Sequence, residues 1–173
     1  HRDLHSFPTR RSSDLADRIR TYLKSGEKQE SVVAAAPYLE SFAKRYQGVV
    51  DFKLSLQGTE RVRVDAARLT DALDNIIANA VEASPPGSEA PCVEAGFHQH
   101  SLVIAVMDRG PGIPTENRSR IFEPFFSTKT RGSGLGFALA RKNVESSGGS
   151  IVYSDRPGGG TMMTVAIPLL AEP

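Results

Sequence analysis

Apolar residues recur every three or four positions between Asp65 and Ser84, and this spacing predicts a helix with one broad buried face. The apolar positions of the segment are Leu69, Ala72, Leu73, Ile76, Ile77, Ala80 and Val81. Asp65 is a suitable N-cap, because its carboxylate can accept a hydrogen bond from a backbone N–H of the first turn. The Pro-Pro-Gly run at 85–87 is a strong stop signal, so the helix is expected to end just before it.

Asn75 and Asn79 lie four residues apart in this helix, so both border the same side of its apolar face. Asparagine is a poor helix former, since its side chain competes for backbone hydrogen bonds. A face that meets only water would more commonly carry Glu, Lys or Gln. Either the two side chains bind a ligand, or they cap neighbouring loops or bond each other. The spacing alone leaves both interpretations open.

Other segments show the two periods that distinguish helices from strands. Helices are expected at 15–24, 37–48, 115–122 and 135–147. Strands are expected at 50–54, 62–64, 92–98, 102–107, 151–154 and 161–167, the last four as two hairpin pairs. Helices and strands do not alternate regularly. We therefore expect an α+β fold, a two-layer α/β sandwich with a mixed sheet of about five strands and helices on one face.

Composition restricts the possible functions. The chain has 173 residues, of which 39% are apolar and 24% charged, as in an ordinary globular domain. A net charge of +1 implies no strong attraction to nucleic acid or to an anionic membrane surface. Cys92 is the single cysteine and cannot form an internal disulfide. No apolar run approaches the ~20 residues of a membrane span, and no signal peptide is evident, so a cytoplasmic location is expected.

Residues 1–14 have neither period and are expected to form a disordered arm. The string is either an ordinary basic tail or, as its resemblance to translated sequencing-adapter DNA suggests, not native to the protein.

The segment Asp-Arg-Gly-Pro-Gly follows the apolar strand 102–107 directly. Asp108 at the strand end can accept a hydrogen bond from an amino group such as the N6 amine of adenine. Gly110 and Gly112 allow positive φ and close approach of a ligand to the backbone. A simple turn between a strand and a helix would use the same glycines, so this motif is not decisive alone.

A second glycine cluster precedes the amphipathic helix expected at 135–147. Backbone N–H groups at such a helix start form an anion site, to which the helix dipole adds. Lys129 and Arg131 stand just before it and could neutralise a phosphate. The segment is neither a P-loop nor a Rossmann fingerprint. A flexible loop that merely begins a helix remains the alternative.

The order of these motifs is more specific than any one of them. An asparagine helix is followed by the Asp108 turn, then by Phe-Glu-Pro-Phe-Phe-Ser-Thr-Lys at 122–129, Gly-Ser-Gly-Leu-Gly at 132–136 and Gly-Gly-Gly-Thr at 158–161. This series resembles the ATP-binding catalytic domain of bacterial sensor histidine kinases, within the gyrase–Hsp90–kinase–MutL ATPase superfamily. The resemblance covers roughly residues 15–168 and implies the Bergerat ATP-binding fold.

The resemblance implies a role for each matching residue. Asn79 would hold the Mg²⁺ that bridges the ATP phosphates, and Asn75 would lie beside them, where hydrolysing relatives carry a general-base glutamate that Asn cannot replace. Asn75 and Lys129 are the residues expected to take part in catalysis. The adenine pocket would comprise Asp108, Gly110, Gly112, Ile113 and Thr161. The lid and phosphate loop would comprise Lys129, Arg131, Gly132, Gly134, Leu135 and Gly136.

Glu82-Ala83 stand where many members carry Lys-Tyr or Arg-Tyr. This variant resembles the nitrogen-regulation-type branch, and it removes one possible phosphate cation.

The resemblance also implies a domain organisation and partners. Residues 15–30 would be the stub of the second dimerisation helix and a linker, and residues 31–170 the catalytic domain. No histidine stands in the family's phosphoacceptor context, so the acceptor would lie on a dimerisation domain missing from a monomeric fragment. A response regulator would take the phosphoryl group next, and the parent protein could be membrane-anchored. An anti-sigma-factor-type serine kinase and a non-catalytic, nucleotide-dependent docking module are the alternatives.

Overall fold

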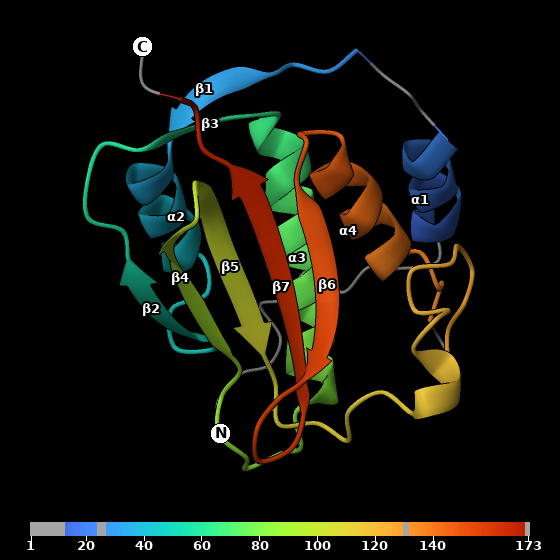
Figure 1. The fold of residues 1–173 in the computed structure, drawn as a ribbon. Helices are drawn as coiled ribbons and strands as arrows, with labels where there is room; N and C mark the ends of the chain where they lie inside the picture. Colours follow the sequence, from blue (N-terminus) through green and yellow to red (C-terminus); the bar gives the residue numbers. More distant parts are fainter. Residues whose placement is uncertain (1–12, 24–26, 130–131, 172–173) are drawn as a thin grey trace.

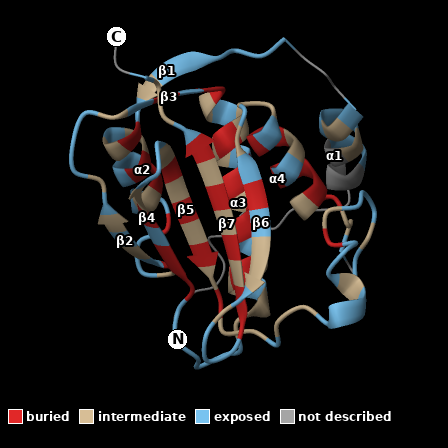
Figure 2. Ribbon diagram, viewed as in Figure 1, coloured by how far each residue is buried: buried red, intermediate tan, exposed pale blue. Residues whose placement is uncertain are grey.

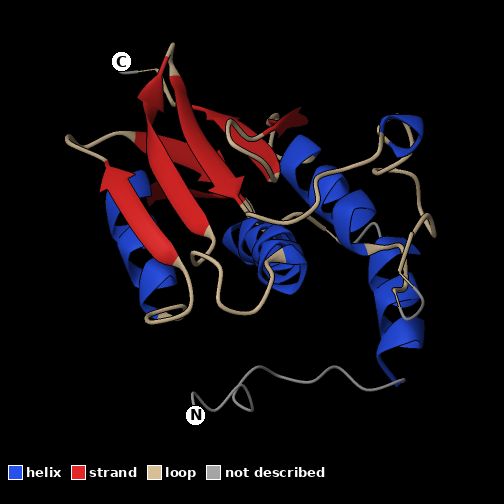
Figure 3. Ribbon diagram, turned by 90° about the horizontal axis from the view of Figure 1, so that it is seen from below, coloured by secondary structure: helices blue, strands red, loops and turns tan. Residues whose placement is uncertain are grey.

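The computed structural model describes residues 13–23, 27–129 and 132–171, and its main body has two layers, a five-stranded sheet and helices on one face of it (Figures 1 and 3). The strands lie in the order β2 (Asp51–Ser55), β4 (Cys92–His98), β5 (Ser101–Met107), β7 (Thr161–Pro168) and β6 (Ser150–Asp155). β2 and β4 are parallel, and the remaining pairs are antiparallel. The predicted α+β sandwich with a mixed sheet and both hairpin pairs are confirmed.

The core lies between the sheet and helices α2 (Ala35–Lys44), α3 (Ala66–Ala83) and α4 (Gly136–Glu145) (Figure 3). Alternate residues of the central strands β5 and β7 are buried, as Figure 2 shows, so their side chains face the helices. The apolar residues among them are Leu102, Ile104, Val106, Met163, Val165 and Ile167. Each large apolar side chain buried in this way contributes roughly 1.5–3 kcal/mol.

α3 runs through the centre of the helical layer, and its ends follow the sequence signals. Asp65 caps it, with Oδ1 accepting a hydrogen bond from the Arg68 backbone N–H at 3.1 Å. At the other end, the Ser84 hydroxyl donates to the Ala80 carbonyl at 2.9 Å, immediately before the two prolines. The cap fixes where the helix begins, and therefore which of its side chains face the end of β5.

A small second sheet pairs β1 (Ser31–Ala34) antiparallel with β3 (Arg61–Val64). The strand at β3 was expected, and its Val62 and Val64 are fully buried. β1 was not expected, because a four-residue segment after a charged stretch carries too little alternation to be recognised. The pairing holds β1, which leads into α2, next to β3, which leads into α3.

Two expected elements differ from the structure. The helix expected at 115–122 is only the 3₁₀ turn η2 (Thr115–Asn117) followed by further turns. No apolar repeat supports a longer helix there, and the Arg118 side chain donates from Nε to the Ile113 carbonyl at 3.1 Å. At the N-terminus, α1 (Ser13–Leu23) includes Ser13 and Asp14, which we assigned to the arm. The rest of the arm, residues 1–12, lies outside the described residues.

No helix in the described part of the chain combines the length and the apolar character needed to cross a bilayer.

Candidate nucleotide-binding site

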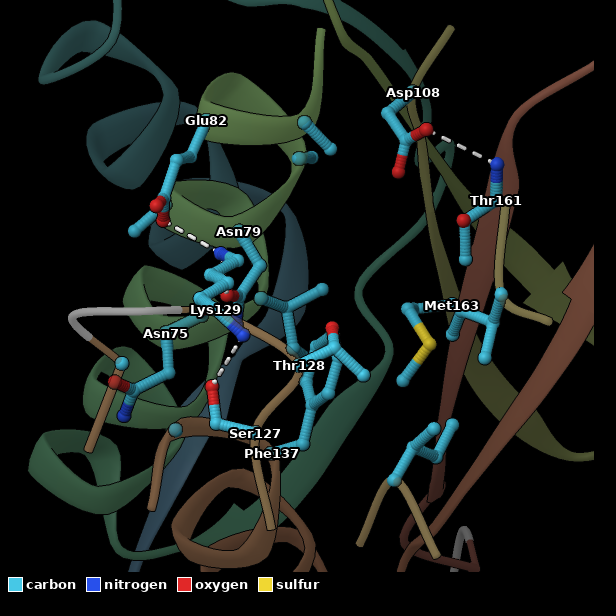
Figure 4. A pocket seen from close by; sticks show the side chains of 18 of the residues that line it. Asn75, Asn79, Glu82, Asp108, Ser127, Thr128, Lys129, Phe137, Thr161 and Met163 are labelled. Atoms are coloured by element: carbon cyan, nitrogen blue, oxygen red, sulfur yellow. Dashed lines mark hydrogen bonds and ion pairs between the residues drawn. The ribbon is translucent and has the colours of Figure 1, made fainter. Parts of the chain in front are cut away.

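A cavity of about 570 Å³ opens between α3, the end of β5, the start of β7 and the loop that leads to α4. Figure 4 shows its two sides, with Asp108 and Thr161 at one end and Asn79, Glu82 and Lys129 across from them. The volume is typical of a site for a small organic ligand. Polar groups therefore stand on two sides of one cavity.

Asp108 is 6% exposed and follows β5 directly. Its Oδ1 accepts hydrogen bonds from the backbone N–H groups of Gly110, at 2.8 Å, and Thr161, at 3.1 Å. Oδ2 has no hydrogen-bond partner within the described residues, and the carboxylate points into the cavity (Figure 4). Because Oδ2 accepts none of these bonds and opens onto the cavity, it can accept a hydrogen bond from a ligand.

The walls beside Asp108 are mostly apolar. They include Ile76 on α3, Val106 on β5, Met163 on β7 and Ile113 in the loop. Gly112, at φ +76°, turns the chain here, and only a residue without a Cβ adopts this conformation readily. A flat heterocycle with an amino edge fits this end of the cavity, since its faces meet apolar side chains and its amine meets Asp108.

Asn75 and Asn79 are oriented by bonds to their own helix. The Asn75 Nδ2 donates to the Asp71 carbonyl and the Asn79 Nδ2 to the Asn75 carbonyl, each at 2.9 Å. Both side chains line the cavity, and a Cβ on Gly136 would lie 3.3 Å from the Asn79 Nδ2. Because its N–H group is engaged, Asn79 turns Oδ1 toward the opposite side.

Lys129 reaches this oxygen from the loop. Its ammonium lies 3.0 Å from Asn79 Oδ1 and 2.6 Å from Glu82 Oε2. Glu82 was not predicted as a site residue from the sequence. The sequence indicated only that Glu82 stands where many family members carry a cationic side chain. Its contact with Lys129 joins positions far apart in the sequence, and no local pattern signals it.

α4 begins at Gly136, against the same end of the cavity, and its N-cap residue, Leu135, makes no side-chain capping bond. The N–H groups of its first turn have no partner within the helix, and together with the helix dipole they favour an anion at this point. Gly132 and Gly134 also line the cavity just before the helix. The cavity thus offers amide oxygens, one ammonium group and backbone donors where a phosphate chain would lie.

Among the described residues, no group of three or more His, Cys, Asp or Glu side chains could hold a metal ion by itself. Mg²⁺ commonly takes one or two protein oxygens and completes its shell with phosphate oxygens and water. Asn79 Oδ1 is a donor of this kind, so the residues present fit a magnesium ion shared with a nucleotide.

A family model described as histidine kinase-, DNA gyrase B-, and HSP90-like ATPase matches residues 64–171, more than half of the chain. The chain belongs to this ATPase family. The match includes the cavity, and family membership implies ATP as the nucleotide.

Known relatives include sensor proteins and sensor histidine kinases. The C4-dicarboxylate transport sensor protein DctS of Rhodobacter capsulatus is 38% identical over 114 residues, which are 64% of this chain and 17% of DctS. The nitrogen regulation protein NtrY of Azorhizobium caulinodans is 40% identical over 103 residues, which are 56% of this chain and 13% of NtrY. The chain therefore spans less than a fifth of either relative, and the two names do not single out one branch.

The nucleotide-free catalytic domain of the histidine kinase ThkA superposes with a TM-score of 0.69 and 27% identity, covering 81% of this chain and 95% of that domain. The chain thus corresponds to the ATP-binding domain of sensor histidine kinases.

The ATPase cavity gathers most of the residues that the motifs predicted. Those that line it are Asn75, Asn79, Asp108, Gly112, Ile113, Lys129, Gly132, Gly134, Gly136 and Thr161. Gly110 does not line it, but its N–H group orients the Asp108 carboxylate. Leu135 is not brought to the cavity either, since its side chain is 1% exposed and packs inward. Arg131 lies outside the described residues.

Sequence reasoning also missed the apolar wall. Ile76 was assigned only to the buried face of its helix, and Val106 and Met163 only to strands, although all three line the cavity. Apolar residues that line a cavity recur along a helix or strand with the same spacing as residues of the core, so the apolar pattern cannot distinguish the two.

Proposed function

We propose that this domain binds Mg-ATP and donates its γ-phosphoryl group to a histidine on the dimerisation domain of a parent sensor kinase. From there the group would pass to an aspartate of a response regulator. One observation carries the proposal: a single cavity has an amine-accepting carboxylate at one end and metal- and phosphate-binding groups at the other.

In this proposal, Asp108 Oδ2 accepts the N6 amine of adenine, while Thr161 and Gly110 hold the carboxylate in place through Oδ1. The apolar walls around Ile113 and Met163 receive the faces of the base. Selection of adenine follows because a carbonyl oxygen at the same ring position would face a carboxylate oxygen without a proton between them.

At the other end, Asn79 would hold the magnesium ion, which when bound neutralises charge on the phosphates. Asn75, Lys129 and the first turn of α4 would position the phosphate chain. Catalysis of phosphoryl transfer is mostly positioning and charge neutralisation, so these residues suffice on the donor side. Asn75 cannot act as a general base, which keeps transfer to water slow.

The acceptor histidine would come from outside the domain. His98 and His100 flank the turn between β4 and β5, at the opposite end of β5 from Asp108. Seven strand residues span roughly 20 Å, so neither imidazole is placed to receive a phosphoryl group from the cavity.

Within the sensor kinases, we assign the domain to the nitrogen-regulation-type branch on Glu82-Ala83 alone. A histidine acceptor is favoured over the serine of an anti-sigma-factor-type kinase, because ThkA and other relatives are named as histidine kinases.

The test supplies the domain with labelled Mg-ATP and a separately prepared dimerisation domain. We expect a phosphoryl group on that domain that is labile in acid and stable in alkali, as phosphohistidine is. A variant with His98→Ala and His100→Ala should transfer equally well, since neither side chain is an acceptor.

The alternatives predict other results. Acid-stable phosphoserine on a protein substrate would support the serine kinase instead. Binding of Mg-ATP without transfer to any of several dimerisation domains would leave a nucleotide-dependent docking module.

A further inference from the structure

Lys129 occupies the position that the proposed function gives to a metal ion. Its ammonium donates a hydrogen bond to Asn79 Oδ1 at 3.0 Å, and this oxygen is the atom proposed to hold magnesium. The Asn79 Nδ2 donates to the Asn75 carbonyl at 2.9 Å, which fixes the orientation of the amide, and the amide has only this one oxygen to offer a metal. An ammonium group and a divalent cation on one amide oxygen would repel each other strongly.

Glu82 is the second partner of the Lys129 ammonium. Its Oε2 contacts the Lys129 ammonium at 2.6 Å, the shorter of the two contacts. Glu82 follows Asn79 by three residues on α3, so both side chains project from the same side of the helix (Figure 4). Carboxylate and amide together form a two-point acceptor for one cation.

We propose that Glu82 is a positioning residue that holds the Lys129 ammonium on Asn79 Oδ1 until metal-bound nucleotide displaces it. Binding is then an exchange: the metal ion takes the oxygen of Asn79, and Lys129 leaves it for the phosphates. The inference rests on the proposed function, because it names a regulator of the same site.

The strength of the contact suits such an exchange. The side chains of Glu82 and Lys129 are 64% and 39% exposed, so solvent weakens their attraction. Exposed ion pairs of this kind change an equilibrium by about two- to fivefold. The pair therefore biases the position of Lys129 without blocking the ligand.

The experiment measures Mg-ATP affinity by calorimetry for the wild type, Glu82→Gln, Lys129→Gln and the double variant. Glutamine keeps the size of Glu82 and removes its charge. We expect Glu82→Gln to bind Mg-ATP about two- to fivefold more tightly, because less work is needed to free Asn79. It should also need less Mg²⁺ for half-maximal binding of ATP.

The double variant separates an effect through Lys129 from a direct one. If Glu82 acts by holding Lys129, most of the gain from Glu82→Gln disappears in the Lys129→Gln background. A gain of the same size in both backgrounds would overturn the proposal and indicate direct repulsion between Glu82 and phosphate. Weaker binding by Glu82→Gln, only when Mg²⁺ is present, would overturn it in favour of Glu82 as a metal ligand.

Glu94→Gln is the matched control. Glu94 forms a similar exposed pair with Lys53 at 3.1 Å, on the sheet and away from the cavity, and its removal should leave the affinity unchanged. Equal affinities of the wild type and Glu82→Gln would refute the role of Glu82 while the proposed function stands. No binding by a folded wild type would instead refute the proposed function itself.

Discussion

Gly159 and Gly160 form a matched pair for testing how closely the β6–β7 loop approaches Asp108. Their φ angles are +100° and +105°, so any side chain is strained at either position. A Cβ on Gly159 would meet nothing within 4 Å. A Cβ on Gly160 would lie 2.1 Å from the Asp108 carbonyl oxygen, where contacts under 3.0 Å essentially never occur.

Both alanine substitutions therefore lose stability through backbone strain, but only Gly160→Ala also loses stability through a steric clash. Backbone strain costs both about 1–3 kcal/mol. Gly160→Ala must also move the loop and Asp108 apart by roughly 1 Å, and such overpacking costs about 1–3 kcal/mol more. The movement would stretch two bonds between Asp108 and Thr161, at 3.0 and 3.1 Å. The carboxylate that faces the ligand would then be displaced.

Urea denaturation followed by circular dichroism gives the free energy of unfolding, and calorimetry gives the affinity for Mg-ATP. We expect Gly160→Ala to be less stable than Gly159→Ala by about 1–3 kcal/mol and to bind ATP at least several-fold more weakly. Gly159→Ala should bind like the wild type. Equal stabilities, together with equal affinities, would show that the close approach at Gly160 does not position Asp108.

Two further predictions concern stability. Burial raises the pKa of Tyr38 to about 12, and its hydroxyl bonds Thr70 Oγ1 at 2.8 Å. The neutral phenol therefore stabilises the fold below pH ~10, and this contribution is lost as pH rises from about 10 to 12. Tyr38→Phe should cost about 1 kcal/mol at pH 8, with a deficit that shrinks over that window in pH-dependent urea titrations; a constant deficit would contradict the assignment. Asp65→Ala removes the α3 cap and the bond from the Gln29 N–H at 3.2 Å, and should lower the unfolding free energy by about 1–2 kcal/mol. A change near zero in the same assay would show that the cap does not stabilise α3.

The fold could be predicted where one repeat extends over many residues. The period between Asp65 and Ser84 defined α3, its cap and its buried face, because all of these depend on neighbours in the chain. β1 and the turns after Pro114 were not predictable in the same way. β1 is stabilised by pairing with β3, some 30 residues away, and its own four residues carry little pattern.

The site shows the same division. The spacing predicted that Asn75 and Asn79 lie on one side of α3. It did not predict the bonds from their N–H groups to backbone carbonyls, which determine where Oδ1 points. The motifs identified Lys129, but not its partner Glu82, since the two are joined only when the loop folds over α3. Leu135 was included by its motif, although its side chain completes the core.

The central claim is that Asp108 recognises the amino group of adenine, and one measurement tests it directly. Calorimetry compares Mg-ATP and Mg-ITP binding to the wild type and to Asp108→Asn. ITP carries a carbonyl oxygen in place of the amine. Because Oδ1 accepts two backbone bonds, the asparagine must direct its only oxygen there and present its amide N–H₂ to the ligand.

The wild type should therefore bind ATP in preference to ITP. In Asp108→Asn, ATP affinity should fall by about tenfold or more, equivalent to about 1.4 kcal/mol, and the preference over ITP should largely disappear. Circular dichroism would establish that both proteins are folded. If the folded wild type bound no Mg-ATP, or if Asp108→Asn bound ATP as tightly as the wild type, the account of this cavity as an adenine-nucleotide site would be contradicted.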